Sequence, residues 1–166
     1  MATFKNLTQI QRHLEKNVHE IMNRSAELER VLADAMSQAV WDVVYAGNEP
    51  AVYQNRRDDG GLSDTRNMSI TSVTVENNKV KLTFENLTQG NEDFIPLYGH
   101  PQDSLHGNFI SDTIVEGIKS NWIRQDGNWT DPRDFVSETI NKLKSNPDEL
   151  ARAIKNGMAA KGMKVK

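Results

Sequence analysis

The 166-residue sequence predicts an α+β fold in which a small antiparallel β-sheet packs against a long N-terminal helix and C-terminal helices. Three observations lead to this prediction: helical periodicity in the first third, a strand pair at residues 68–85, and two proline-marked helix starts near the C-terminus. In the second strand the apolar residues Val80, Leu82 and Phe84 alternate with polar ones. One apolar and one polar face are typical of an antiparallel sheet that helices cover on one side.

The first element is a helical region over residues 6–46. Apolar residues recur along it at alternating steps of four and three, with Ser25 at the one polar position. This seam consists of Leu14, Val18, Ile21, Leu28, Leu32, Ala35 and Ala39. Asn6 and Gln9 resemble a capping box at its start, and Gly47 to Pro50 ends it. The region is one long helix or two with a break near residues 23–25. Its seam predicts domain core or an inter-subunit surface.

The segment 51–86 is predicted to hold a polar loop and a β-hairpin. We expect residues 51–67 to form a mobile loop, with a short strand at 51–54. A basic and aromatic cluster in this loop suits contact with an acidic partner surface or a phosphate backbone. The cluster consists of Tyr53, Arg56, Arg57 and Arg66. A solvated loop is the alternative for this cluster. Acids such as Asp58, Asp59 and Asp64 are expected to be solvated. The hairpin follows, with Asn77-Asn78 as its turn.

Residues 86–110 are the least regular part of the chain. A loop of this length inside a compact domain is functional or disordered. His100, Asp103 and His106 share it, and a metal site there is conceivable. Their spacing matches no specific ligand pattern, so surface histidines are the favoured interpretation.

The C-terminal region 111–166 is predicted to hold three helices. Ser111 or Asp112 caps the first, whose apolar residues are Ile114, Val115, Ile118, Trp122 and Ile123. The second begins with Asp131 as the cap, Pro132 at the first helical position and Asp134 adding negative charge. Its predicted apolar stripe consists of Phe135, Val136, Thr139, Ile140 and Leu143.

The last helix starts at Asn146-Pro147 and carries Leu150, Ile154 and Met158 at four-residue spacing, and Gly162 is expected to stop it. No acid follows Glu149. The basic residues of this stretch include Lys155, Lys161, Lys164 and Lys166. Such a tail suits the lining of a DNA passage. It also complements the negative end of the helix dipole, which is the favoured explanation.

Composition narrows the function. The chain has no cysteine, 37% hydrophobic residues and a net charge of −3, which excludes thiol chemistry and argues against a general nucleic-acid binder. We identify no signal peptide, no membrane-spanning run, no phosphate loop and no paired carboxylates at working spacing. We therefore expect one domain over residues 1–166, made in a cytoplasm, that has no cofactor and is not an enzyme.

Several motifs occur in a familiar order. They are Tyr53…Arg56-Arg57…Gly60-Gly61-Leu62, the hairpin, Ile114-Val115-Glu116-Gly117-Ile118, Trp129-Thr130-Asp131-Pro132-Arg133-Asp134-Phe135, and the ending Ile154-Lys155-Asn156-Gly157-Met158…Lys161-Gly162-Met163-Lys164-Val165. Together they resemble the tail-completion or neck family of long-tailed bacteriophages, also labelled minor tail component or head–tail joining proteins. The resemblance covers most of the chain and is strongest in the last third.

This resemblance implies a structural, non-enzymatic virion protein with an α+β fold, assembled in the bacterial host cytoplasm. Such proteins form an oligomeric ring in the neck, between the head connector or stopper protein and the tail terminator or tail tube, and DNA passes through the lumen. The loop before the hairpin would contact partners. Trp129, Pro132, Arg133 and Phe135 would fix the C-terminal helix. The chain departs from the family in its long 86–110 segment and in its net acidity.

Two other classes stay open. The first is a binding module or regulator that engages one protein partner through residues 86–110. The second, ranked lower, is a metal-dependent hydrolase built around His100, Asp103 and His106.

Overall fold

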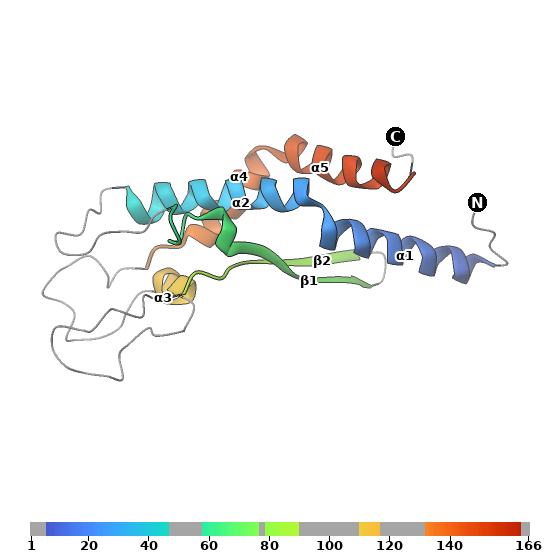
Figure 1. Ribbon diagram of the computed structural model, residues 1–166, viewed down its shortest axis with the longest axis horizontal. Coiled ribbons are helices and arrows are strands. Elements are labelled where there is room, and N and C mark those ends of the chain that lie inside the picture. Colours follow the sequence, from blue (N-terminus) through green and yellow to red (C-terminus); the bar gives the residue numbers. More distant parts are fainter. Residues whose placement is uncertain (1–5, 47–57, 77–78, 90–109, 117–131, 164–166) are drawn as a thin grey trace, which may run out of the picture. The chain divides into compact units, whose positions relative to one another are not determined.

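A computed structural model describes residues 6–46, 58–76, 79–89, 110–116 and 132–163 (Figure 1). These ranges contain the helices α1 (Leu7–Arg24), α2 (Ala26–Val40), α3 (Ile110–Glu116), α4 (Phe135–Ser145) and α5 (Pro147–Ala160). They also contain a π-helical turn η1 (Trp41–Tyr45), a 3₁₀ turn η2 (Thr65–Asn67) and the strands β1 (Met68–Glu76) and β2 (Lys79–Asn86). The two strands form an antiparallel sheet, which confirms the predicted α+β class.

The chain divides into two compact units, and each is discontinuous in sequence. Unit 1 consists of Met1–Leu32, Ile70–Glu85 and Asn146–Lys166, and unit 2 of Ala33–Ser69 and Asn86–Ser145. The predicted single domain over residues 1–166 stays a prediction. Within the described ranges, no helix combines the length and apolar character needed to cross a membrane.

The N-terminal helical region contains two helices that meet at Ser25. The Asn6 side chain accepts a hydrogen bond from the Gln9 backbone N–H at 3.0 Å, which caps α1 as expected. Ser25 leaves the helical conformation with ψ 99°, and its hydroxyl accepts a hydrogen bond from the Leu28 N–H at 3.2 Å. Ser25 therefore ends α1 and also caps α2. This double role explains a polar residue within an otherwise apolar seam.

Most of the predicted seam is buried. Ile21, Leu28, Leu32 and Ala39 are buried, and Val18 and Ala35 are half-buried. Leu14 is exposed, so the domain-core alternative does not hold for this residue, while the inter-subunit alternative stays a prediction. Helix α5 packs on α1 near Ile21, almost two turns further along, so the cover does not extend to Leu14.

Helix α5 attaches to the N-terminal helices of unit 1 through small residues and ion pairs. Ala153 is fully buried, and Gly157 faces the Ile21 side chain. The Lys161 ammonium lies 3.0 Å from the Glu20 carboxylate, and the Asn156 amide donates to the Glu27 carboxylate at 3.0 Å. Contacts from residue 153 to residue 161 therefore hold α5 in unit 1.

Both ends of α5 agree with the prediction. The helix has Asn146 at its N-cap and Pro147 in its first turn. At the other end Gly162 has φ +75°. The Met163 N–H donates to the Met158 carbonyl and the Gly162 N–H to the Ala159 carbonyl. This pattern is a Schellman motif, and glycine adopts its left-handed position without steric cost.

The hairpin joins unit 1 through the N-terminal end of α2. The Ile70 N–H donates to the Glu29 carboxylate at 3.2 Å, and Val73 is buried. The expected alternation in β2 holds in part. Leu82 and Phe84 are half-buried, but Val80 is exposed, so the apolar face of the hairpin is not covered up to the turn. Asn77 and Asn78 lie outside the described residues.

Unit 2 contains the other buried cluster. Its buried apolar residues are Ala33, Met36, Ala39, Val40, Val44, Leu62, Met68, Ile114 and Phe135. Helix α3 begins at Ile110, so the prediction that Ser111 or Asp112 caps this helix was wrong, and both lie within its first turn. Val115 is half-buried, while Ile118, Trp122 and Ile123 fall outside the described residues.

The start of α4 also differs from the prediction. The helix begins at Phe135, three residues after Pro132. The Asp134 carboxylate accepts hydrogen bonds from the Ser137 N–H at 2.8 Å and from the Ser137 hydroxyl at 2.6 Å, so Asp134 is the cap. The Arg133 N–H donates to the Ile114 carbonyl at 2.9 Å. Residues 132–133 thus lie before the helix, and this bond joins them to a distant segment.

The predicted stripe of α4 is only partly buried. Phe135 and Thr139 are buried, and Leu143 is half-buried. Val136 and Ile140 were expected in the same stripe but are exposed. The buried face of α4 is therefore narrower than the sequence predicts.

Candidate interaction surfaces

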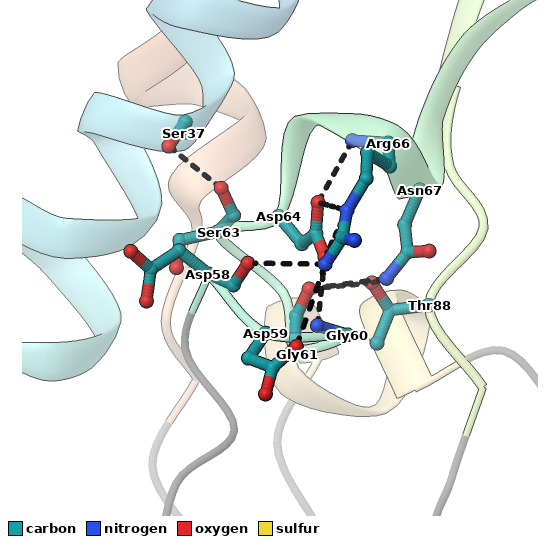
Figure 2. Close-up of polar contacts among 10 residues, drawn as sticks. All are labelled: Ser37, Asp58, Asp59, Gly60, Gly61, Ser63, Asp64, Arg66, Asn67 and Thr88. Carbon is teal, nitrogen blue, oxygen red and sulfur yellow. Dashed lines mark hydrogen bonds and ion pairs between the residues drawn. The ribbon is translucent and has the colours of Figure 1, made fainter.

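A cluster of polar contacts centres on the buried carboxylate of Asp64 (Figure 2). This carboxylate accepts hydrogen bonds from the Gly60 N–H at 2.7 Å, from the Arg66 N–H at 2.9 Å and from the Arg66 Nε at 2.9 Å. The Arg66 guanidinium holds the pKa of Asp64 well below its usual value, and the two backbone donors lower it further. These hydrogen bonds to Asp64 stabilise the turn from Gly60 to Arg66.

Backbone carbonyls tie the same turn to neighbouring parts of unit 2. The Gly61 carbonyl accepts from the Asn67 amide at 3.3 Å and from the Thr88 hydroxyl at 3.1 Å. The Ser63 carbonyl accepts from the Ser37 hydroxyl on α2 at 2.8 Å, as Figure 2 shows. The Asn86 amide, at the end of β2, donates to the Leu62 carbonyl at 2.7 Å. Hydrogen bonds to α2 and to the end of β2 therefore hold residues 60–67.

These contacts correct two expectations. Residues 58–67 were expected to belong to a mobile loop, but the segment is hydrogen-bonded and its residues 61–64 are buried. Asp64 was expected to be solvated, but it is buried and paired with Arg66. A buried carboxylate needs such partners, because an unpaired one is costly. The sequence signal for this pairing was an aspartate and an arginine only two residues apart, Asp64 and Arg66, shortly after Gly60-Gly61.

The predicted contact cluster is only partly described. Tyr53, Arg56 and Arg57 lie outside the described residues. Arg66 lies on the surface but pairs with Asp64, and its guanidinium also lies 3.5 Å from the Asp59 carboxylate. These two carboxylates therefore partly neutralise the charge of Arg66 within its own turn.

The junction of η1 and α4 contains part of the predicted structural motif. The Arg133 guanidinium donates to the Val44 carbonyl at 3.5 Å, and Phe135 is fully buried. The Lys142 ammonium lies 2.6 Å from the Asp42 carboxylate and lowers the pKa of Asp42. These contacts fix α4 on the π-helical turn. Pro132 lies exposed just before α4, and Trp129 falls outside the described residues.

The predicted basic tail is described at two of its four lysines. Lys155 is exposed. Lys161 pairs with Glu20, which lowers the pKa of that carboxyl. Lys164 and Lys166 are not among the described residues.

Two short helix faces expose apolar side chains, and three of these, Leu14, Val136 and Ile140, belong to the predicted apolar seam or stripe. The α1 ridge consists of Ile10 and Leu14, which are 38% and 48% exposed. The α4 ridge consists of Val136 and Ile140, which are 39% and 46% exposed. The α1 ridge belongs to unit 1 and the α4 ridge to unit 2. Each is a pair at i,i+4 spacing on one helix face.

The three residues of the conceivable metal site, His100, Asp103 and His106, lie outside the described ranges. Within those ranges, no group of three or more histidines or acids could hold a metal ion. Sequence reasoning also missed Gly157, whose role depends on a helix 136 positions away in the chain and leaves no local signal.

Comparison with known proteins supplies one family. The family model described as YomN matches residues 6–160, which is nearly the whole chain. The chain therefore belongs to the YomN family, and this membership indicates a phage-related protein. No curated protein and no solved structure matches the chain.

Proposed function

We propose that this protein is a structural component of the phage neck that completes the tail and joins it to the head connector as part of an oligomeric ring. The observation that carries the proposal is the presence of two different exposed apolar ridges on a chain whose family is phage-related. A ring requires a heterologous contact, in which one surface of a subunit meets a different surface of the next. A chain that exposes two unlike apolar faces meets this requirement.

Assembly rather than catalysis is the proposed mechanism. Each ridge contributes only two apolar side chains, so one contact is weak and the free subunit stays soluble. Closing a ring multiplies weak contacts, because each new subunit joins at high effective concentration. The proposed partners are further copies of this chain, a connector or stopper protein on the head side and a tail terminator or tail tube protein on the other.

Two surfaces remain candidates for these partners. Tyr53, Arg56 and Arg57 directly precede the turn that Asp64 fixes, so the sequence joins them to a rigid anchor. Of the C-terminal lysines, Lys155 is exposed whereas Lys161 pairs with Glu20, and an exposed lysine suits non-specific contact with passing DNA. The protein would be made and assembled in the bacterial cytoplasm and would reside in the virion neck.

Electron microscopy of a lysate from the parent phage with this gene deleted tests the proposal. Filled heads beside complete, unattached tails are the expected result. Normal joined virions would contradict it and would favour a regulator that engages one partner through residues 86–110.

A double variant, Arg56→Ala with Arg57→Ala, tests the contact cluster in the same assay. We expect an unchanged melting temperature and impaired joining. The matched control is Lys79→Ala, which removes an exposed cation from β2 and should join normally. Normal joining by the double variant would remove the cluster from the proposal.

A further inference from the structure

We propose that the α1 ridge of one copy packs on the α4 ridge of the next copy, with the two helices parallel. This inference rests on the proposed ring and names its subunit contact. The occupant of each ridge is thus a second copy of this chain.

The first argument is the match in form. Ile10 and Leu14 are four residues apart, and so are Val136 and Ile140. Side chains at this spacing lie one above the other on a helix and form a short ridge. Ridges at i,i+4 spacing interdigitate when two helices pack. Each ridge therefore has the length and shape to cover the other.

The second argument is charge. Lys144 continues the line of Val136 and Ile140 by one further turn and is exposed. Glu15 lies next to Leu14 in α1, where its carboxylate accepts a hydrogen bond from Gln11. In the proposed parallel pair, Ile140 of one copy lies beside Leu14 of the next. Lys144 then lies one turn beyond Leu14, from where its long side chain can reach the Glu15 carboxylate at the edge of the contact. An opposite charge at the edge of an apolar contact fixes its register and orientation.

The antiparallel arrangement is less favourable. It would place Lys144 beside the start of α1, where Asn6 caps the helix. The N-terminal end of a helix dipole is positive and disfavours a cation there.

Pairing of two identical ridges would satisfy the apolar side chains but not the proposed function. A contact between two α1 ridges, or between two α4 ridges, is self-complementary and closes at a dimer. Only the mixed contact leaves one ridge free on each end of the growing assembly. The two self-pairings are therefore outcomes that the experiment must separate.

Disulfide trapping on the purified full-length chain tests the contact, because the sequence has no cysteine to interfere. The double variant Leu14→Cys with Ile140→Cys, oxidised at high protein concentration, should give a ladder of dimers, trimers and larger species on a non-reducing gel. The matched control is Arg12→Cys with Ile140→Cys, since residue 12 lies on the opposite face of α1 and is exposed. The control should remain monomeric.

Three results would overturn the proposal. Dimers from Leu14→Cys alone, or from Ile140→Cys alone, would indicate self-pairing. A stronger ladder from Ile10→Cys with Ile140→Cys would indicate antiparallel helices. Absence of a ladder at any concentration would remove the contact.

A charge exchange tests the orientation independently. Lys144→Glu in the double-cysteine background should slow ladder formation roughly two- to fivefold, as expected for an exposed ion pair. Adding Glu15→Lys should restore the original rate. Failure of the second change to restore it would show that these two residues do not meet.

The outcomes separate this inference from the neck role. Unattached tails in the deletion lysate without a ladder would leave the neck role standing and refute this contact. A ladder together with normal virions in the deletion lysate would support this contact and refute the neck role.

Discussion

Gly157 of α5 meets Ile21 of α1 at a point where no larger residue fits. A Cβ atom built on Gly157 would lie 2.7 Å from Cγ2 of Ile21, which is closer than carbon atoms approach in folded proteins. The glycine is therefore used for close helix contact rather than for an unusual backbone conformation. It sets how near α5 comes to α1 within unit 1.

Gly157→Ala is expected to destabilise the protein by a net amount of up to about 2 kcal/mol. Alanine favours an isolated helix by about 1 kcal/mol over glycine, but overpacking in a close contact costs about 1–3 kcal/mol and shifts the backbone. Relief of the clash requires movement of the backbone, so we expect the overpacking cost to exceed the gain in helix propensity. Urea denaturation followed by circular dichroism measures the difference in unfolding free energy.

Two controls accompany this experiment. Lys155→Ala changes an exposed residue of the same helix and should leave stability within about 0.5 kcal/mol. In an Ile21→Ala background the penalty of Gly157→Ala should shrink, since the clashing methyl group is gone. An undiminished penalty in that background would mean that the helix contact is not its cause.

Asp64→Asn is expected to lower stability at neutral pH by about 1–3 kcal/mol and to reduce its acid sensitivity. Folded Asp64 has a lowered pKa, so the unfolded chain binds more protons in acid. The contribution of Asp64 is therefore complete above the ordinary aspartate pKa of about 3.9 and is lost as pH falls through that value towards the folded pKa. Urea midpoints measured from pH 6 to pH 2.5 test both effects.

The comparison for this measurement is Asp59→Asn, because Asp59 is exposed in the same turn. We expect it to keep both the stability and the acid sensitivity of the parent. Asp42, Asp134 and Glu20 also have lowered pKa values, so Asp64→Asn should flatten the pH profile without abolishing its slope. Identical profiles for the two variants would refute a special role for Asp64.

Phe135→Ala is expected to cost about 3–5 kcal/mol, because Phe135 is fully buried at the start of α4. Val136→Ala, on the exposed next position, should cost far less and serves as the matched control. Thermal unfolding by calorimetry distinguishes the two. Equal losses would mean that Phe135 is not part of the core.

Ser37→Ala and Ser63→Ala should differ although both remove one hydroxyl. The Ser37 hydroxyl donates to the Ser63 carbonyl, and its loss should cost about 1 kcal/mol. The buried Ser63 hydroxyl has no hydrogen-bond partner among the described residues. Ser63→Ala should therefore be neutral or slightly stabilising in the same denaturation assay. A larger loss at Ser63 than at Ser37 would contradict this assignment.

Local pattern predicted the elements well, because their signals are contained in short windows of sequence. Apolar periodicity indicated α1 and α2, alternation indicated β2, and Asn146-Pro147 with Gly162 marked the two ends of α5. What failed depended on distant partners. The α4 helix starts at Phe135 rather than at Pro132, and the Arg133 N–H before it bonds to the Ile114 carbonyl, a contact that no window around Pro132 reveals.

The candidate surfaces were predicted less well for the same reason. Periodicity assigned Leu14, Val136 and Ile140 to apolar stripes, but burial depends on whether another element covers the position. Asp64 was taken for a solvated acid because its partners come from both sides of a turn. The family shows only a phage-related protein, so the neck role stays a proposal, and the arginine cluster at residues 56–57 stays a prediction.

The pairing of α1 with α5 also fixes the order of events during synthesis. Glu20 and Lys161 are 141 residues apart, so α1 leaves the ribosome long before its partner exists. Unit 1 can close only after residue 161 has been synthesised, because a contact between distant residues needs both partners. A truncated chain would lack α5 and leave Ile21 uncovered. Such a fragment should expose apolar surface of α1 and be degraded more readily than the full chain.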